Sequence, residues 1–373
     1  MAVPLLELNT QNLALEGELK AAFESVLKSG QFILGPENRA FETEIGAMIG
    51  VQHAIAVSSG TDAILLALMA LDIKAGDEVI CPSFTFFATA GCVVRAGAIP
   101  VFVDSDAASF NIDPDDVARK ITTKTRAIMP VHLFGQCAGM DPIVELARGK
   151  GIRIIEDGAQ ALGATYKGRQ VGTIGDFGAF SFFPSKNLGG FGDSGLLVTN
   201  DGVLAERATL LRTHGAKPKY YHKFVGANFR MDDLQCALLR VKLPHYGDYT
   251  KGRQSNARYY AGKLGSIAGI GSKIILPKEN PDHGHIWNQF TLRVRDGRRD
   301  ELKEFLASRQ IGSEIYYPVP LHRQECFAEF RKRAGDLPVA DQLAQEVLSI
   351  PVYPELRQEQ LDEVIAAIAE FVK

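Results

Sequence analysis

Seven short apolar runs, many of them separated by helical patterns, constrain the fold of this 373-residue chain more than any other feature. Most of them are continuously apolar, as strands covered on both faces of a sheet should be. The runs are Ala54–Val57, Glu78–Cys81, Ile99–Val103, Arg126–Val131, Arg153–Glu156, Gly178–Phe182 and Leu196–Thr199. Helical stretches such as Asp62–Leu71 and Asp141–Lys150 lie between many of them. The alternation predicts an α/β domain with a seven-stranded, mainly parallel sheet, whose ligands bind at the carboxyl ends of the strands.

The last third of the chain has a different pattern and predicts a second, smaller domain. A long helical pattern from about Met231 to Leu264, with a kink at Pro244, would connect the two domains. A strand, a charged helix, a proline-rich loop and a terminal amphipathic helix follow at Gln289–Val294, Asp300–Gln310, Tyr316–His322 and Gln358–Phe371. We therefore expect a large domain with an N-terminal segment over residues 1–250 and a small α+β domain over residues 251–373.

Composition argues against several classes of protein. The chain is 46% apolar and 23% charged, as ordinary globular proteins are, and its net charge of −3 argues against a general nucleic-acid-binding role. No segment has the ~18 uninterrupted apolar residues of a membrane span, and the first residues do not form a signal peptide. Five cysteines without a CxxC pair, and no zinc-binding spacing, indicate a reducing compartment and no metal site. We expect a cytoplasmic protein that binds neither nucleic acid nor membranes.

The residues that indicate chemistry most directly are Lys186 and Asp157, which lie 29 positions apart. Lys186 follows an apolar strand and precedes a glycine-rich loop, where partial burial would favour its neutral, nucleophilic amine. Asp157 ends a neighbouring strand and could keep a pyridinium nitrogen protonated. Alone, each has an ordinary explanation, a solvated lysine and a helix cap. Together they are the two groups that a pyridoxal phosphate enzyme needs.

Two further segments would complete such a site. Ser58–Asp62 follows one strand and opens an apolar helix, whose free N–H groups suit a phosphate, with Gly60 allowing close approach and Thr61 adding a hydroxyl. The alternative is a plain helix N-cap. Pro82–Phe87 ends the next strand, and one of its three phenylalanines could stack on a flat ring, while we expect the other two to pack in the core.

Three other segments leave alternatives open. Gly190–Gly195 matches the dinucleotide fingerprint GxGxxG, but it precedes a strand instead of following one, so we interpret it as a loop and do not favour a nicotinamide dehydrogenase. Lys217–Lys223 is basic and aromatic and could bind a diphosphate and stack on a base, or it could be a solvated loop. Tyr316–His322 could close a sugar pocket or could simply form a turn.

In combination these motifs resemble a known family, the fold-type I, pyridoxal phosphate-dependent nucleotide-sugar aminotransferases of the DegT/DnrJ/EryC1/StrS group. The resemblance covers nearly the whole chain. The segments that carry it are Ser29–Pro36 with Phe41 and Glu42, Ser59–Ala63, Pro130–Gln136, Glu156–Gln160, Ser181–Asn187, Asn228–Asp232 and Tyr317–His322. Motifs in this number and order make the resemblance specific.

The resemblance implies a role for each matching cofactor-binding residue. Lys186 would carry pyridoxal 5'-phosphate as a Schiff base and later transfer a proton, and Asp157 would pair with the pyridine nitrogen. Gln160 would contact the ring hydroxyl, and Phe86 would stack on the ring. The residues that would hold the phosphate are Gly60, Thr61 and Ser181.

The resemblance also implies partners and substrates. An asparagine of the partner subunit reaches the phosphate in this family, and Asn228 matches it, which implies an obligate homodimer with shared active sites. The residues that match substrate-binding positions are Phe32, Arg230, Tyr317 and His322. The implied reaction moves an amino group, from L-glutamate, to a keto group of a nucleotide-linked sugar. The segments Thr213–His222 and Asn228–Asp232 favour C3 of the sugar over C4.

Two alternatives to this reaction stay open. One is an aminotransferase that acts on a free cyclic ketone such as an inosose, against which the basic loop Lys217–Lys223 argues mildly. The other is a non-catalytic pyridoxal phosphate sensor. Against a sensor, no DNA-binding segment is appended and all the catalytic positions are filled, Lys186 included.

Overall fold

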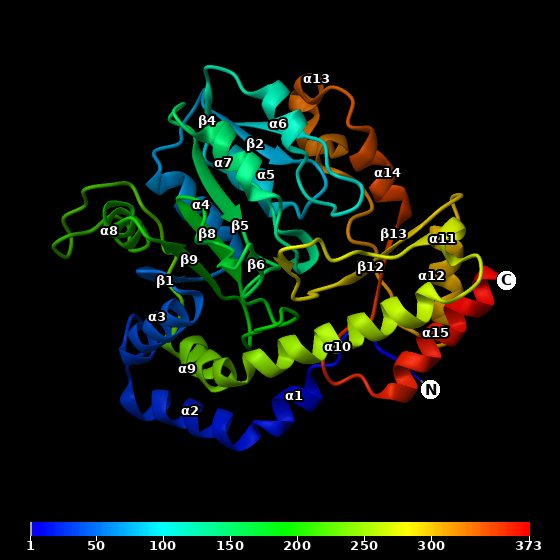
Figure 1. Ribbon diagram of the computed structural model, residues 1–373. Helices are drawn as coiled ribbons and strands as arrows, with labels where there is room; N and C mark the ends of the chain where they lie inside the picture. The colour runs from blue at the N-terminus through cyan, green and yellow to red at the C-terminus, as the bar shows by residue number, and fades with distance from the viewer. Residues whose placement is uncertain (1) are drawn as a thin grey trace.

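The computed structural model describes residues 2–373, with a large part built on one seven-stranded sheet and a smaller part that contains the C-terminus (Figure 1). In spatial order the strands are β1 (His53–Val57), β9 (Gly195–Thr199), β8 (Phe177–Ser181), β5 (Arg153–Asp157), β4 (Thr125–Ile128), β2 (Glu78–Pro82) and β3 (Ile99–Val103). Strand β9 is antiparallel to both neighbours, and the other adjacent pairs are parallel. All seven predicted runs form this sheet, which confirms the α/β fold.

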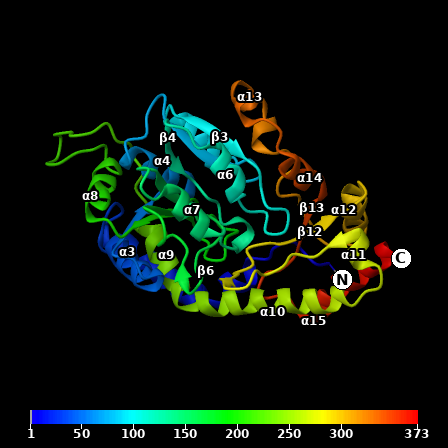
Figure 2. The ribbon, with the colours of Figure 1, turned by 45° about the horizontal axis from the view of Figure 1, so that its top comes forward.

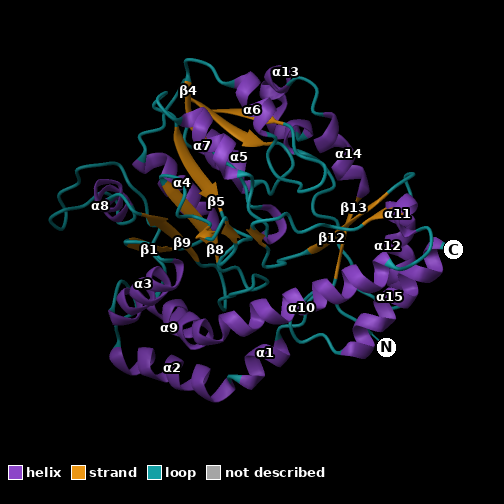
Figure 3. Ribbon diagram, viewed as in Figure 1, coloured by secondary structure: helices purple, strands orange, loops and turns teal. Residues whose placement is uncertain are grey.

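Helices cover both faces of the sheet (Figure 3). Each face has its own buried core. Side chains alternate between the two, so that Ile55 and Val57 of β1 lie in one core and Ala56 lies in the other. The covering helices are α4 (Gly60–Ala70), α5 (Ala88–Arg95) and α8 (Gly202–Leu211) on one side, and α3 (Pro36–Ile49), α6 (Pro114–Lys120), α7 (Met140–Ala147) and α9 (Asp233–Lys242) on the other. Because both faces are covered, a ligand reaches the sheet at its strand ends.

The helical pattern predicted from Met231 onward forms two helices that meet at Pro244. Helix α9 is followed by a 3-10 turn over Leu243–His245 and then by α10 (Tyr246–Gly265). Proline lacks the N–H and crowds the preceding turn, so the kink was predictable from the residue. Helix α10 extends along the molecule from the large part to the small part, where it packs against α15 (Gln358–Val372) (Figure 2).

The small part contains a three-stranded antiparallel sheet whose core is shared by the last helix of the chain. Its strands, in spatial order, are β10 (Ile274–Ile275), β12 (Phe290–Val294) and β13 (Val347–Ile350). Helices α12 (Arg299–Ser308) and α15 share this core, whereas the buried residues of α14 (Pro338–Glu346) join a core of the large sheet. The predicted strand, charged helix and terminal helix are confirmed. Strand β13 was not predicted, because it follows α14 directly, with no glycine or proline between them to signal a boundary.

Two observations bear on the division predicted at residue 250. Helix α10 passes through that residue without a break, and Val3 pairs with Ile311 and is buried in the core of the small part. The first residues of the chain therefore pack on the small part. The division into 1–250 and 251–373 stays a prediction.

The remaining elements are short or peripheral. They are α1 (Asn9–Ala14), α2 (Glu16–Ser29), α11 (Ile270–Lys273), α13 (Arg331–Ala334), β6 (Thr165–Tyr166), β7 (Arg169–Gln170) and β11 (His283–Gly284). Over residues 2–373, none of the helices combines the length and the apolar character needed to cross a bilayer.

Candidate active site

A cavity of about 470 Å³ lies at the carboxyl ends of β2, β5 and β8. Its walls come from the start of α4, from the loops that follow these strands, and from the loop of the small part that contains Tyr316. The volume is within the range of roughly 300–1,000 Å³ that small-molecule sites have. Eight of the twelve predicted site residues line it: Gly60, Thr61, Phe86, Asp157, Gln160, Ser181, Lys186 and Tyr317.

Lys186 lies in a turn just beyond β8. Its main-chain N–H donates to the carbonyl of Phe183 at 2.8 Å, and its side chain lines the cavity. Desolvation lowers the pKa of Lys186 to about 8, although the charge of Asp157 opposes this effect. An amine with this pKa has a substantial neutral fraction near pH 7 and can act as a nucleophile.

Asp157 ends β5 and is 4% exposed. Burial raises the pKa of this carboxyl group, while the hydroxyl of Thr89 and the main-chain N–H of Ala159 act against the rise. Thr89 Oγ1 donates to Oδ2 at 2.8 Å, and the Ala159 N–H donates to Oδ1 at 3.2 Å. Each carboxylate oxygen thus has a donor that favours the ionised form, which is the form able to pair with a protonated ring nitrogen.

The N-terminus of α4 forms another wall of the cavity, through Gly60 and Thr61. Ser59 caps this helix by accepting a hydrogen bond from the Asp62 N–H at 3.0 Å, as a helix N-cap does. A Cβ atom at Gly60 would lie 2.8 Å from Cβ of Ser181, so glycine allows the helix to approach the end of β8. The first N–H groups of a helix have no partner within the helix, and here they border the cavity beside the Ser181 hydroxyl.

Gln160 and Tyr317 join the two parts of the molecule across the cavity. Gln160 Oε1 accepts from the Phe134 N–H at 2.7 Å, and Gln160 Nε2 donates to the hydroxyl oxygen of Tyr317 at 3.1 Å. The Tyr317 ring lies 6.0 Å from the ring of Phe86, which is 54% exposed and lines the cavity. A flat ligand ring beside Phe86 would cover this exposed aromatic surface.

The prediction that two of the three phenylalanines after β2 are in the core is wrong. Phe84 is fully buried, but Phe86 and Phe87 are both about half exposed. Phe87 stacks on Phe327 of the small part, with ring centroids 5.4 Å apart, instead of entering the core. The segment turns out of the sheet at this point, so its side chains no longer alternate between buried faces.

Four predicted site residues lie outside the lining of this cavity: Phe32, Asn228, Arg230 and His322. Phe32 and Asn228 are exposed, whereas Arg230 pairs with Val57 through the backbone. His322 is almost fully buried, with Nδ1 2.6 Å from Oγ of Ser83 and Nε2 3.4 Å from a carboxylate oxygen of Asp341. Their predicted roles in binding stay predictions.

Several residues around the cavity were not predicted. Thr89 contacts Asp157 from the first turn of α5, and Thr85, Asp193 and Gln289 line the cavity. Glu156 belongs to β5 and is buried outside the lining. Only the position of Thr85, in the loop three residues beyond the end of β2, gave a signal in the sequence. Thr89, Asp193 and Gln289 reach the site through contacts between segments that are separated in the chain.

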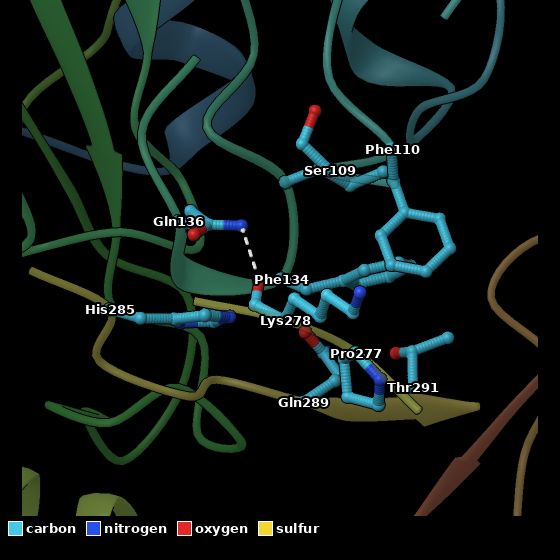
Figure 4. Close-up of a pocket in the computed structure, with 10 residues that line it drawn as sticks. Ser109, Phe110, Phe134, Gln136, Pro277, Lys278, His285, Gln289 and Thr291 are labelled. Atoms are coloured by element: carbon cyan, nitrogen blue, oxygen red, sulfur yellow. Dashed lines mark hydrogen bonds between the residues drawn. The ribbon is translucent and has the colours of Figure 1, made fainter. Parts of the chain in front are cut away.

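A much smaller cavity lies beside the first (Figure 4). It measures about 10 Å³, which is room for about one water molecule. It shares Leu133 and Gln289 with the large cavity. At its edge, Nε2 of Gln136 donates to the main-chain carbonyl of Lys278 at 3.2 Å. This bond ties the loop after β4 to the segment that leads into β12 and so supports the wall of the large cavity.

The lining of the large cavity fits pyridoxal phosphate, because a desolvated amine, a buried carboxylate and a helix N-terminus border the same space. Residues 14–369 match the DegT/DnrJ/EryC1/StrS aminotransferase family. The chain belongs to this family. It is therefore an aminotransferase, and its cofactor is pyridoxal 5'-phosphate, on which enzymes of the family depend.

Individual relatives match over nearly their whole length. A "pleiotropic regulatory protein" of Geobacillus stearothermophilus is 45% identical over 100% of this chain and 99% of its own. A UDP-N-acetyl-3-dehydro-alpha-D-glucosamine 3-aminotransferase of Acidithiobacillus ferrooxidans is 43% identical over 98% of this chain and 97% of its own. The crystal structure of DesV from S. venezuelae superposes with a TM-score of 0.95 at 43% identity, over 100% of this chain and 99% of that one.

Proposed function

We propose that this aminotransferase transfers an amino group from L-glutamate to a keto group of a nucleotide-linked sugar, with C3 favoured over C4. One observation carries the proposal: a lysine of lowered pKa and a buried, hydrogen-bonded aspartate border the same cavity. Pyridoxal phosphate, when bound, supplies an electron sink that makes the hydrogen next to the amine acidic.

Each residue that lines the cavity would have its own role toward that cofactor. Lys186 would attach the cofactor covalently. Once the amine of the substrate has displaced it, its free, neutral Nζ would take a proton from one carbon and return it to another. Asp157 would stay ionised and hold the ring nitrogen protonated. Gln160 would contact the ring hydroxyl, and Phe86 would stack on the ring. The phosphate would be held by Gly60, Thr61 and Ser181.

A nucleotide-linked acceptor is supported by two independent observations. The Acidithiobacillus relative is named for a 3-amination of a UDP-linked sugar, which also favours C3 here. The loop Lys217–Lys223 has three lysines and two exposed tyrosines, Tyr220 and Tyr221, a combination that suits a diphosphate and a flat base. A free cyclic ketone would use neither feature.

We also propose a cytoplasmic homodimer with shared active sites. Asn228 is exposed and lies outside the cavity of its own chain, so it is available to a second copy. Exposed Phe32 and the segment around Arg230 are available in the same way. In this arrangement Asn228 would complete the phosphate site of the partner, and Phe32, Arg230, Tyr317 and His322 would surround the sugar.

A non-catalytic sensor is the second candidate, because the Geobacillus relative bears a regulatory name. A sensor needs to bind the cofactor but has no need of a lysine whose neutral fraction near pH 7 is raised above that of an ordinary lysine. The lowered pKa of Lys186 therefore favours turnover.

An absorbance spectrum of the purified protein, recorded before and after addition of L-glutamate, tests the proposal. A band near ~410–430 nm that moves to ~330 nm is expected for a lysine-bound cofactor converted to its amine form. Keto sugars with and without a nucleotide would then be tested for the reverse change. A band that does not respond to any amino acid would favour the sensor, and transamination by a Lys186→Ala variant would contradict the role of the lysine.

A further inference from the structure

Two threonine hydroxyls form a chain that ends on the carboxylate of Asp157. Thr89 Oγ1 lies 2.8 Å from Oδ2 of Asp157, and Thr85 Oγ1 lies 3.1 Å from Thr89 Oγ1. Thr85, in the loop after β2, is 2% exposed, and Thr89, in the first turn of α5, is fully buried. Thr85 and Asp157 line the cavity, whereas Thr89 lies behind them.

The direction of the hydrogen bonds follows from the chemistry of the groups. An ionised carboxylate only accepts, so the single proton of the Thr89 hydroxyl must point at Asp157. The Thr89 oxygen can then only accept in its contact with Thr85, so the Thr85 hydroxyl is the donor. Hydrogen bonds arranged in series polarise one another, so the Thr85 hydroxyl strengthens the bond from Thr89 to Asp157.

The charged and titratable groups around Asp157 offer it little other support. Burial and the charge of Asp157 raise the pKa of the Cys81 and Cys92 thiols to about 12, so both thiols are neutral. Burial also raises the pKa of the Tyr317 hydroxyl. The remaining neighbours with an effect on Asp157 are Lys186 and His132, whose influence on its pKa is smaller than that of Thr89.

The support from Lys186 is also temporary. Its positive charge is lost above about pH 8, and its amine is occupied when it carries the cofactor. In those states the donors that the chain itself supplies to the carboxylate are the hydroxyl of Thr89 and the N–H of Ala159. A charge-assisted hydrogen bond in a buried site is among the stronger hydrogen bonds, so loss of the Thr89 hydroxyl should raise the pKa of Asp157.

We propose that Thr89, assisted by Thr85, is a positioning residue that keeps Asp157 ionised and aimed at the ring nitrogen of the cofactor. The inference rests on the proposed role of Asp157. It predicts that the two hydroxyls set the pH range in which the cofactor is bound tightly, because a protonated Asp157 cannot pair with a protonated ring nitrogen.

The test is a titration of apoprotein with pyridoxal phosphate at a series of pH values, which measures affinity and not turnover. The Thr89→Val variant keeps the shape of the side chain and removes the hydroxyl. We expect about tenfold weaker binding near pH 7, and a loss of affinity on acidification that begins about one pH unit higher than in the wild type. Thr85→Val should change the affinity and the pH at which it is lost in the same directions, but by less. Thr89→Ser keeps a hydroxyl and should bind the cofactor nearly as the wild type does.

Thr199→Val is the matched control. Thr199 is a buried threonine at the opposite end of β9, where its hydroxyl donates to the carbonyl of Asp176 at 2.7 Å. The Thr199→Val substitution should change the melting temperature of the apoprotein without shifting the pH dependence of cofactor binding. A Thr89→Val variant that matches the wild type in affinity and pH profile, or a Thr199→Val variant that shifts both equally, would overturn the inference. Wild-type protein that fails to take up the cofactor would instead overturn the proposed function.

Discussion

Lys242 donates a hydrogen bond from its buried ammonium group to the main-chain carbonyl of Gly189, three residues beyond Lys186, at 2.8 Å. The same nitrogen lies 3.2 Å from Oδ1 of Asn12 and 5.4 Å from the ring centroid of Phe191. Helix α9 thereby holds the end of the turn that contains Lys186.

Replacement of Lys242 by Met should loosen that turn while keeping the apolar stem of the side chain in place. We expect about a tenfold slower single-turnover reaction with L-glutamate, because small displacements of a reacting group reduce rates strongly. Stopped-flow absorbance of the cofactor measures this rate. Lys251→Met, at an exposed position of α10, is the control and should react at the wild-type rate. An unchanged rate in Lys242→Met would show that the turn needs no anchor.

The lowered pKa of Lys186 has a direct chemical consequence. With a pKa of about 8 in place of 10.5, its neutral fraction at pH 7 is about 300-fold larger than that of an ordinary lysine. Competitive acetylation of the apoprotein between pH 6 and 11, followed by mass spectrometry, should give a midpoint near pH 8 for Lys186. Because the charge of Asp157 raises this pKa, Asp157→Asn should move the midpoint lower still. A midpoint near 10.5 in the wild type would contradict the desolvation argument.

Local sequence patterns predicted the sheet and the centre of the site, but not the contacts between distant segments. All seven apolar runs became strands, because continuous apolar runs bounded by turn residues are a local signal. Lys186 and Asp157 were found from their places at strand ends, which the fold brings together. Thr89 was missed because a threonine in the first turn of a helix looks like any other until the fold brings it against Asp157.

Local patterns also could not predict the residues that lie outside the cavity of the single chain. Asn228 and Phe32 were assigned through a resemblance to a family, and not from a local pattern. In the dimer that we propose, a second copy would complete the site, and such a contact leaves no periodicity in the sequence. The exposed position of Phe87, which stacks on Phe327 of the small part, was likewise set by packing between the two parts of the molecule.

Glu156 is a buried acid next to Asp157, and its contacts hold a neighbouring loop. It is fully buried and accepts hydrogen bonds from the N–H groups of Gly172, Ile174 and Gly175, at 2.7–2.8 Å, and it lies 3.0 Å from Nε2 of His132. Glu156→Gln places an NH₂ group where an acceptor is required, and we expect a loss of about 3 kcal/mol in the free energy of unfolding.

Urea denaturation of the apoprotein measures this loss. Glu301→Gln is the control, because Glu301 pairs with Arg298 at the surface and should give no measurable change. Equal stability of Glu156→Gln and the wild type would mean that the loop over residues 172–175 is held by other contacts.

Substitution of Gly60 tests whether the N-terminus of α4 holds the phosphate of the cofactor. A Cβ atom there would lie 2.8 Å from Cβ of Ser181, so Gly60→Ala must push the start of α4 away from the end of β8. We expect at least tenfold weaker binding of pyridoxal phosphate to the apoprotein. Overpacking costs about 1–3 kcal/mol, and here it would displace the groups that would hold the phosphate. Gly262→Ala is the matched control: it lies within α10, and a Cβ atom there meets nothing within 4 Å. The control should bind the cofactor as the wild type does and melt slightly higher, since alanine favours the helix. Normal cofactor affinity in Gly60→Ala would mean that the phosphate is held elsewhere.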